Sequence, residues 1–280
     1  MGFHSEGLVR NLTDLARNLR IQVIEMIYCA QSGHPGGSLS AADIVAALYF
    51  NHLRLDPMRP DWPERDRFIL SKGHAAPLLY AALCERGFFG QECLTTLRCL
   101  DSPLQGHPDR LKTDGVEMTA GSLGHGLSVG VGLALGACLD GAAYRTYVLL
   151  GDGEIQAGII WEAAMTAAKY GLGNLTAILD YNDVQLDGPV HEIMPLEPVK
   201  AKWESFGWHT VEIDGHNMHQ ILEALDEATH VHSQPTIIIA HTVKGKGVSF
   251  MENKSTWHGR APTEEEYKIA MAELRGEANG

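Results

Sequence analysis

The chain has 280 residues, 45% hydrophobic and 20% charged, which is enough for a sizeable core without disulfide bridges or a structural metal. Thirty-five acidic and 22 basic residues give a net charge of −13, and no basic stretch could follow a phosphate backbone, which argues against nucleic acid as a partner. The sequence shows no apolar run as long as a membrane span and no signal peptide, so we expect a globular, cytoplasmic protein without membrane contacts.

The apolar pattern of the first half of the chain predicts mainly helices. Apolar residues recur every three or four positions from Leu8 to Ile27, the spacing of an amphipathic helix that ends near Ser32 and Gly33. In chain order, the sequence then predicts a loop over residues 33–40, a helix over 41–50, a strand over 67–70, helices over 77–86 and 91–100, an irregular polar stretch over 101–120, and a helix from about Gly126 within the Gly-rich segment 121–136.

Strands and helices alternate in the second half. The expected strands cover residues 146–150, 175–180, 210–213 and 236–241, and the expected helices cover 159–170, 199–206, 218–229 and 263–280. Repeated units of this kind with nearly continuous apolar strands predict an α/β fold, in which helices cover both faces of a parallel sheet. Because the sequence shows no internal repeat and no linker, we expect residues 1–280 to form a single domain. The five cysteines lack a C-x-x-C pair, which predicts reduced thiols packed in helices.

Polar residues follow two neighbouring strands of the predicted sheet. Gly151-Asp152-Gly153-Glu154 follows the strand over 146–150, and Asn182 follows the strand over 175–180. Ligands of open parallel sheets bind at the carboxyl ends of strands. The Gly-Asp-Gly run alone is better interpreted as an ordinary turn capped by the aspartate. With Asn182 one strand later, the pattern favours a site for a hard cation, Mg²⁺ or Ca²⁺, that bridges a diphosphate.

Six of the 14 histidines lie directly beside a glycine in predicted loops: His34, His74, His107, His125, His216 and His258. Any one of them alone is best interpreted as a surface or structural histidine, and we assign His216 and His219, at a helix start, to that class. Together, imidazoles can donate to phosphate, accept from hydroxyls and relay protons near neutral pH, which suits a sugar phosphate. The set lacks the spacing of metal ligands.

From about Leu12 to Pro262 the sequence resembles the N-terminal, thiamine diphosphate-binding half of transketolases. Five further groups of residues carry this resemblance beside the Gly151–Gly153 and Asn182 signature. Four of these groups are similar to the family's histidine segments: Ser32–Gly37, Ser71–His74, Gln105–Pro108 and Trp257–Gly259. The fifth, Gly121–Gly126, is similar to the loop that contacts the rings of the cofactor.

The resemblance implies the thiamine diphosphate-binding fold and specific residue roles. Asp152, Asn182 and the Val184 carbonyl are implied to hold the metal. His34, His107 and His258 are implied to face the ketose donor and to act in catalysis. The residues implied to contact thiamine diphosphate are His74, Gly121, Ser122, Leu123, Gly151, Asp152, Gly153, Glu154, Asn182 and His258.

In the family the cofactor lies between two domains, and the second supplies the glutamate that activates the aminopyrimidine. This sequence shows no second domain of that kind. The resemblance therefore implies one subunit of a split transketolase, which is active only with a separate C-terminal, pyrimidine-binding subunit, and we expect an α2β2 heterotetramer. Such an enzyme transfers a two-carbon ketol unit from a ketose phosphate to an aldose phosphate, as in the pentose phosphate pathway.

Three departures from the family pattern leave alternatives open. Ala157 stands where the family often has glutamate, His125 where it has glutamine, and Thr242–Gly247 lacks the usual Gly-Ser ending. One alternative keeps the cofactor but changes the sugar: a specialised ketolase for a branched or sulfonated sugar, or a deoxyxylulose-type synthase. The other is a non-catalytic regulatory subunit, which has no physical need for the Asp152–Asn182 pair and the histidines.

Overall fold

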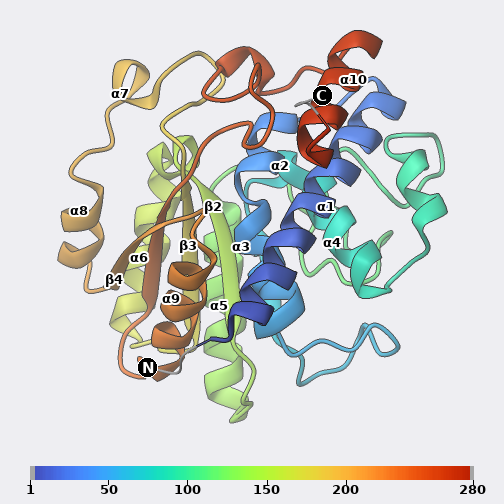
Figure 1. Cartoon of the computed structure of the whole chain (residues 1–280). Coiled ribbons are helices and arrows are strands. Elements are labelled where there is room, and N and C mark those ends of the chain that lie inside the picture. The colour runs from blue at the N-terminus through green and yellow to red at the C-terminus, as the bar shows by residue number, and fades with distance from the viewer. Residues whose placement is uncertain (1–3, 278–280) are drawn as a thin grey trace.

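The computed structural model describes residues 4–277, and a parallel sheet of five strands lies at its centre (Figure 1). The strand order is β1-β2-β3-β5-β4, and every neighbouring pair is parallel. The strands are β1 Arg67–Leu70, β2 Thr146–Gly151, β3 Leu175–Tyr181, β4 His209–Asp214 and β5 Thr236–His241. The predicted α/β fold is confirmed, and each predicted strand matches an observed one or lies within it.

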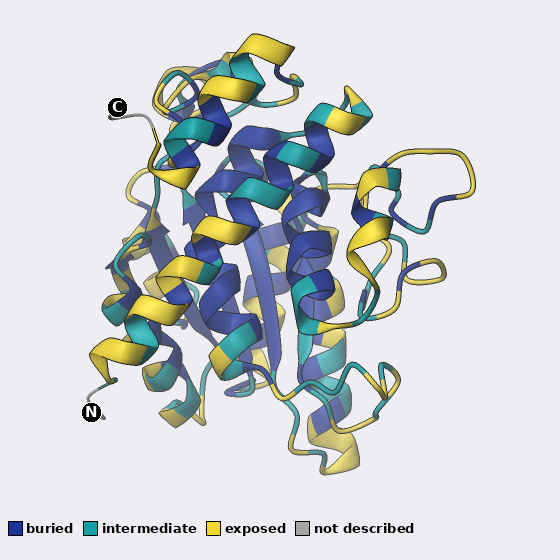
Figure 2. Cartoon of the chain, turned by 45° about the vertical axis from the view of Figure 1, so that its right-hand side comes forward, coloured by how far each residue is buried: buried dark blue, intermediate teal, exposed yellow. Residues whose placement is uncertain are grey.

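Helices bury both faces of the sheet. Successive residues of β2 alternate between two hydrophobic clusters, with Tyr147 and Leu149 in one and Val148 and Leu150 in the other. The first cluster includes the helices α1 Glu6–Ala30, α3 Ala42–Ala47, α4 Ala76–Arg86, α9 Met218–His230 and α10 Glu264–Arg275. The second includes α5 His125–Asp140, α6 Gly158–Lys169 and α8 Val199–Ser205. Figure 2 shows the outcome: the central strands are buried, whereas the outer faces of the helices are exposed.

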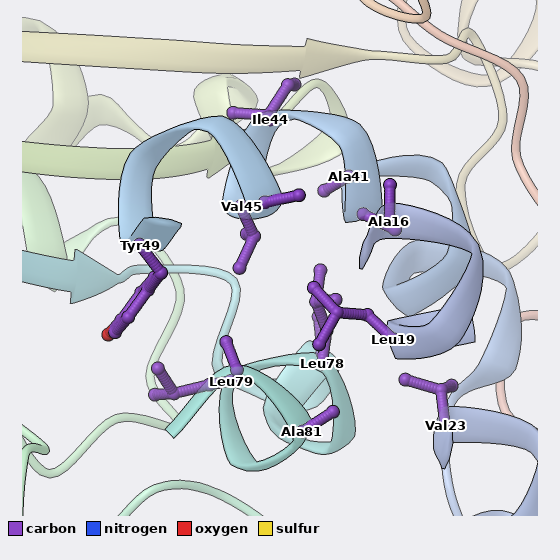
Figure 3. Packing of buried hydrophobic residues seen from close by; sticks show 14 of the residues in the cluster. Ala16, Leu19, Val23, Ala41, Ile44, Val45, Tyr49, Leu78, Leu79 and Ala81 are labelled. Carbon is purple, nitrogen blue, oxygen red and sulfur yellow. The ribbon is translucent and has the colours of Figure 1, made fainter. Parts of the chain in front are cut away.

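The first helix forms as its apolar spacing predicts. The side chain of Ser5 caps α1 by accepting a hydrogen bond from the backbone N–H of Leu8, and the helix ends where Gln31 turns left-handed. Leu19 and Val23 of α1 come together with Leu78 of α4 in the first cluster (Figure 3). None of the helices in residues 4–277 is both long and apolar enough to cross a membrane.

Two predictions for the first hundred residues are wrong. Residues 33–40 are not a loop throughout, because they contain the helix α2 Pro35–Ser40, in which every residue is buried. The helix begins at its proline, a residue that is favoured in the first turn. Tertiary packing then outweighs the low helix propensity of the two glycines that follow. The predicted helix over 91–100 is only a 3₁₀ turn, Gln91–Thr96, since Leu94 is its single buried residue.

The other predicted helices are confirmed with small shifts at their ends. The helix expected over 41–50 is α3 followed by a π-helical turn, Leu48–His52, and the irregular stretch over 101–120 has no helix or strand. The terminal helix ends at Arg275, and residues 278–280 of that prediction lie outside the described residues. A single turn, α7 Val190–Ile193, was not predicted. All five cysteines are free thiols, but only Cys84 is buried, so the expectation of helix-packed thiols is correct only in part.

A buried ionic network joins the helical layer to the loops that follow β4 and β5. Arg20 of α1 donates to the Leu39 carbonyl (3.1 Å) and to Asp43 Oδ2 (2.5 Å). His216 Nδ1 lies 2.8 Å from the same carboxylate, and its Nε2 accepts from the backbone N–H of Val243 at 2.8 Å. His216 therefore has a structural position, which supports the segment just before Lys244.

Replacing Arg20 by methionine should destabilise the chain by about 3 kcal/mol, because Asp43 then stays buried without its cation. Urea unfolding followed by circular dichroism measures the change. The double variant Arg20→Met with Asp43→Asn should recover part of the loss, since it removes the stranded charge. Equal stability of Arg20→Met and the unsubstituted protein would show that the pair contributes nothing.

Candidate active site

A cavity of about 450 Å³ opens at the carboxyl ends of β2 and β3. The turn Gly151–Glu154 follows β2, and residues 182–187 follow β3. Lys244 and His258 reach the cavity from the segment after β5. Nine of the residues assigned from the sequence line it: His74, Leu123, Gly151, Asp152, Gly153, Glu154, Asn182, Val184 and His258. The topology thus brings distant motifs to one edge of the sheet, as expected for an open parallel sheet.

Asp152 is buried at the base of this cavity and is held by backbone donors. Its Oδ1 accepts from Gly153 N at 2.7 Å, and its Oδ2 accepts from the N–H groups of Asn182 (2.9 Å) and Asp183 (2.6 Å). Burial raises the pKa of Asp152 to about 6, and the nearby carboxylate of Asp180 adds to the rise. The turn after β3 therefore wraps around the carboxylate and fixes its direction.

Three kinds of oxygen meet beside Asp152. Asn182 Oδ1 accepts from the backbone N–H of Val184 at 3.2 Å, and the Val184 carbonyl accepts from Lys244 Nζ at 2.8 Å. A carboxylate, an amide oxygen and a backbone carbonyl are the donor set that Mg²⁺ and Ca²⁺ prefer. The ammonium of Lys244 shows that the Val184 carbonyl already attracts a cation. Among residues 4–277 no group of three or more His, Cys, Asp or Glu side chains could hold a metal ion, so any such site depends on these mixed oxygens.

A buried lysine and aspartate lie behind the cavity. Lys72 is 2% exposed and Asp180 is fully buried, and Lys72 Nζ lies 2.5 Å from Asp180 Oδ2. Lys72 also donates to the Gly37 carbonyl at 2.7 Å, and Asp180 accepts from the hydroxyls of Ser40 and Thr242. Burial would raise the pKa of Asp180, but Lys72 and these hydroxyls hold it below its ordinary value. The pair therefore ties α2, β3 and the segment after β5 together.

The sequence patterns assign no role to Lys72, Asp180 or Lys244. Both lysines lie between the end of a strand and a glycine, in motifs whose glycines and histidines attract more attention. That shared position is the sequence feature that could have indicated a role for them. Burial lowers the pKa of Lys244 to about 8, and the neighbouring Lys72 adds to this effect. Lys244 Nζ lies 3.1 Å from His258 Nδ1. A positive charge thus faces the cavity beside the histidines.

Glu154 organises the backbone around the cavity. Its Oε1 accepts from Gly124 N at 2.7 Å and from the Ser71 hydroxyl, and its Oε2 accepts from Gly151 N at 3.0 Å. Burial raises the pKa of this carboxyl group. Glu154 thereby joins the loop before α5, the loop after β1 and the turn after β2.

Three imidazoles meet at the cavity mouth. Ring centroids are 5.3 Å apart for His34 and His74, 5.6 Å for His34 and His258, and 4.9 Å for His74 and His258. Burial, reinforced by nearby bases, lowers the pKa of His34 to about 4 and that of His258 to about 3, and the pKa of His74 lies well below its ordinary value. At neutral pH each ring is uncharged and offers one donor and one acceptor. His34 Nδ1 is buried without a hydrogen-bond partner among the described residues, which leaves a polar atom available to a ligand.

Four assigned residues, His34, His107, Gly121 and Ser122, do not line the cavity. Exposed His107 faces Gly121, where a Cβ atom would lie 3.8 Å from the His107 ring. Ser122 is exposed, and Leu123, 44% exposed, reaches the cavity. Two of the three departures from the family pattern lie close together: a Cβ atom added at Gly124 would lie 3.3 Å from that of Ala157, and Gly124 precedes His125, the first residue of α5.

Comparison with known proteins identifies this arrangement. Residues 12–277 match the family model described as the thiamine diphosphate binding domain of transketolase. The chain belongs to the transketolase family. It is 46% identical over 274 residues to the 6-deoxy-6-sulfo-D-fructose transketolase subunit SqwG of a Clostridium species, covering 98% of this chain and 96% of that one. It is 44% identical over 255 residues to a subunit of the apulose-4-phosphate transketolase of Phocaeicola vulgatus, covering 91% and 90%.

Full-length transketolases match the chain over less than half of their own length. Human transketolase is 44% identical over 250 residues, which cover 89% of this chain and 40% of the human protein. The crystal structure of transketolase from Campylobacter jejuni superposes with a TM-score of 0.91 at 34% identity, covering 100% of this chain and 44% of that one. The fold is thus that of the thiamine diphosphate-binding domain of transketolases, as the sequence resemblance implied.

The lowered pKa of His34 predicts a pH-dependent contribution to stability. Between pH 6.5 and about 4 the unfolded chain binds a proton at His34 and the folded chain does not, so stability falls as the pH falls. For this partly exposed ring we expect up to about 1 kcal/mol per pH unit. The free energy of unfolding of His34→Asn, measured by urea titration at pH 7, 6 and 5, should therefore decline less than that of the unsubstituted protein. His219→Asn, at an exposed position, serves as the control, and parallel pH profiles for His34→Asn and the unsubstituted protein would contradict the assignment.

Proposed function

We propose that this chain is the cofactor-binding subunit of a two-chain transketolase, which transfers a two-carbon ketol unit from a ketose phosphate to an aldose phosphate. One observation carries the proposal: the chain matches two proteins named as transketolase subunits over at least 90% of their length, but only 40% of a full-length transketolase. Both hydrophobic clusters share the same sheet, which supports residues 1–280 acting as one domain. We place the enzyme in the cytoplasm and the pentose phosphate pathway, and its free thiols suit a reducing compartment.

The residues at the cavity fit thiamine diphosphate with a divalent metal. Asp152, Asn182 and the Val184 carbonyl would hold Mg²⁺ or Ca²⁺, and Lys244 would leave the carbonyl for the diphosphate. His74 and His258 would donate to diphosphate oxygens, while the backbone at Gly121, Ser122, Leu123, Gly151 and Gly153 lets the cofactor approach. Asn182 would contact the diphosphate through the metal, and Glu154 would hold this backbone in place. When bound, thiamine diphosphate supplies the electron sink for the two-carbon unit.

The histidines of this chain would handle the donor sugar. His34, His107 and His258 would face the ketose, and an uncharged imidazole can accept the proton of a sugar hydroxyl or return it. His34 Nδ1 is buried without a partner in the described residues, so a hydrogen-bonding group of a bound ligand would satisfy it. Orientation of the ketose hydroxyls is thus the proposed contribution of these residues.

A C-terminal, pyrimidine-binding subunit is the proposed partner, in an α2β2 heterotetramer with the sites at the interfaces. Relatives named as subunits support a partner. Apolar side chains that line the cavity also remain exposed, namely Leu123, Leu186 and Ile193. Exposed apolar groups that gather at a binding site are typical of protein interfaces.

A second substrate class has specific support. The names of the two subunit relatives specify 6-deoxy-6-sulfo-D-fructose and apulose 4-phosphate, so the same chemistry on an unusual sugar is the second candidate. A regulatory role is less favoured because Asp152, Lys72 and the histidine cluster are all in place.

Asp152→Ala should abolish metal-dependent binding of thiamine diphosphate, since it removes the charged member of the oxygen set. Calorimetric titration of the complex with the C-terminal, pyrimidine-binding subunit, with and without Mg²⁺, measures the affinity for thiamine diphosphate. Asp61→Ala, which removes an exposed carboxylate outside this set, is the control. Unchanged affinity in Asp152→Ala would contradict the proposed metal site.

Ketol transfer should require both chains. The assay mixes the purified chain with its partner, thiamine diphosphate and Mg²⁺, and supplies xylulose 5-phosphate with ribose 5-phosphate; each chain alone is the control. Activity of the mixture alone would support the main proposal. Turnover of a sulfonated or otherwise unusual ketose in place of xylulose 5-phosphate would support the second candidate, and no complex between the chains would refute both.

A further inference from the structure

Arg98 lies between the two loops that carry His34 and His107. Its Nη1 donates to the Ser32 hydroxyl at 3.0 Å, two residues before His34. Its guanidinium covers Gly106, the residue before His107: Nη2 lies 3.5 Å from the Gly106 carbonyl oxygen, and a Cβ atom at Gly106 would come within 3.0 Å of Arg98 Cζ. One planar side chain therefore spans both loops, which are separated by about 70 residues of sequence.

The backbone at Arg98 is held in an unusual conformation. Arg98 has φ 61° and Asp101 has φ 63°, a left-handed region that non-glycine residues rarely adopt. The turn is closed by the backbone hydrogen bond from Arg98 N to the Leu104 carbonyl (2.9 Å), and Leu97 and Leu104 are both buried. Strained positions of this kind persist where the surrounding structure determines them, often at functional sites. The turn directs the arginine toward the histidine loops.

We propose that Arg98 is a positioning residue for the donor-sugar side of the site: it joins the His34 loop to the His107 loop and thereby fixes the two imidazoles relative to each other. This inference rests on the proposed function, because it assigns the arginine a part in orienting the ketose. Lysine could not replace it, since a single ammonium cannot contact both loops as a planar fork does.

The charge of Arg98 has a second effect on the same histidines. Burial is the largest cause that lowers the pKa of His34 and of His107. The positive charge of Arg98 is the next largest cause for both histidines. The other bases that face His34 are His107 and Lys244, with the rings of His74 and His258 beside it. Arg98 therefore favours the uncharged imidazole, the form that can accept a proton from a sugar hydroxyl.

The first test needs no transketolase activity. Histidine ¹³Cε1 resonances of the full chain are titrated by NMR, with His34 and His107 assigned from their glutamine variants. In Arg98→Met the titration midpoints of both histidines should rise, and in Arg98→Lys they should stay close to those of the unsubstituted protein. Arg17→Met, which removes an exposed positive charge paired with Asp14, is the control. Unchanged midpoints in Arg98→Met would overturn the electrostatic part of the proposal.

The second test measures positioning in the two-chain enzyme. Arg98→Lys keeps the charge but loses the bridge, so kcat/KM for the donor ketose should fall by about tenfold or more, with unchanged affinity for thiamine diphosphate. Arg17→Met should keep full activity. Unchanged kcat/KM in Arg98→Lys would overturn the positioning role. If the unsubstituted complex transfers no ketol unit at all, the proposed function fails, and the NMR titration still decides whether Arg98 controls the histidines.

Discussion

The buried ion pair of Lys72 and Asp180 is the interaction on which the site depends. Placing two charges in the interior is expensive, and hydrophobic residues of similar size would often give equal stability. Here every group around the pair adds a hydrogen bond, from the Gly37 carbonyl to the hydroxyls of Ser40 and Thr242. The pair thus adds a charged contact to the backbone hydrogen bonds that join α2, the end of β3 and the segment after β5.

The distribution of charge around this anchor separates two tasks. Acidic and amide oxygens gather at the strand ends, where Asp152 and Asn182 stand over the ion pair, while the histidine rings lie on the outer side among bases. A divalent cation is attracted by the first group and the anionic phosphates by the second. Under the proposed function, the oxygens would hold the metal of the cofactor, and His258 would serve both the diphosphate and the ketose.

The sequence predicts the sheet well because its strands are short apolar runs with turns at their ends, and it predicts Asp152 and Asn182 because strand ends converge in a parallel sheet. It fails at α2, where burial of a glycine-rich segment outweighs its weak local preference. Lys72 and Lys244 were missed for a related reason: lysine in a sequence normally indicates solvent exposure, and only the folded chain shows their buried partners. Arg98 was missed because its role depends on a contact between loops far apart in sequence.

The close packing of α2 limits which of its positions can accept a larger side chain. An added Cβ at Gly36 would lie 2.9 Å from the Trp257 carbonyl oxygen, and one at Gly37 would lie 3.4 Å from His74 Nε2. Alanine at Gly36 would therefore press on the backbone, whereas alanine at Gly37 would just reach contact distance from the His74 ring. The rim near His107 and Leu123 is exposed, so under the proposed function a library concentrated there would vary contacts with the sugar and leave the buried wall of the site intact.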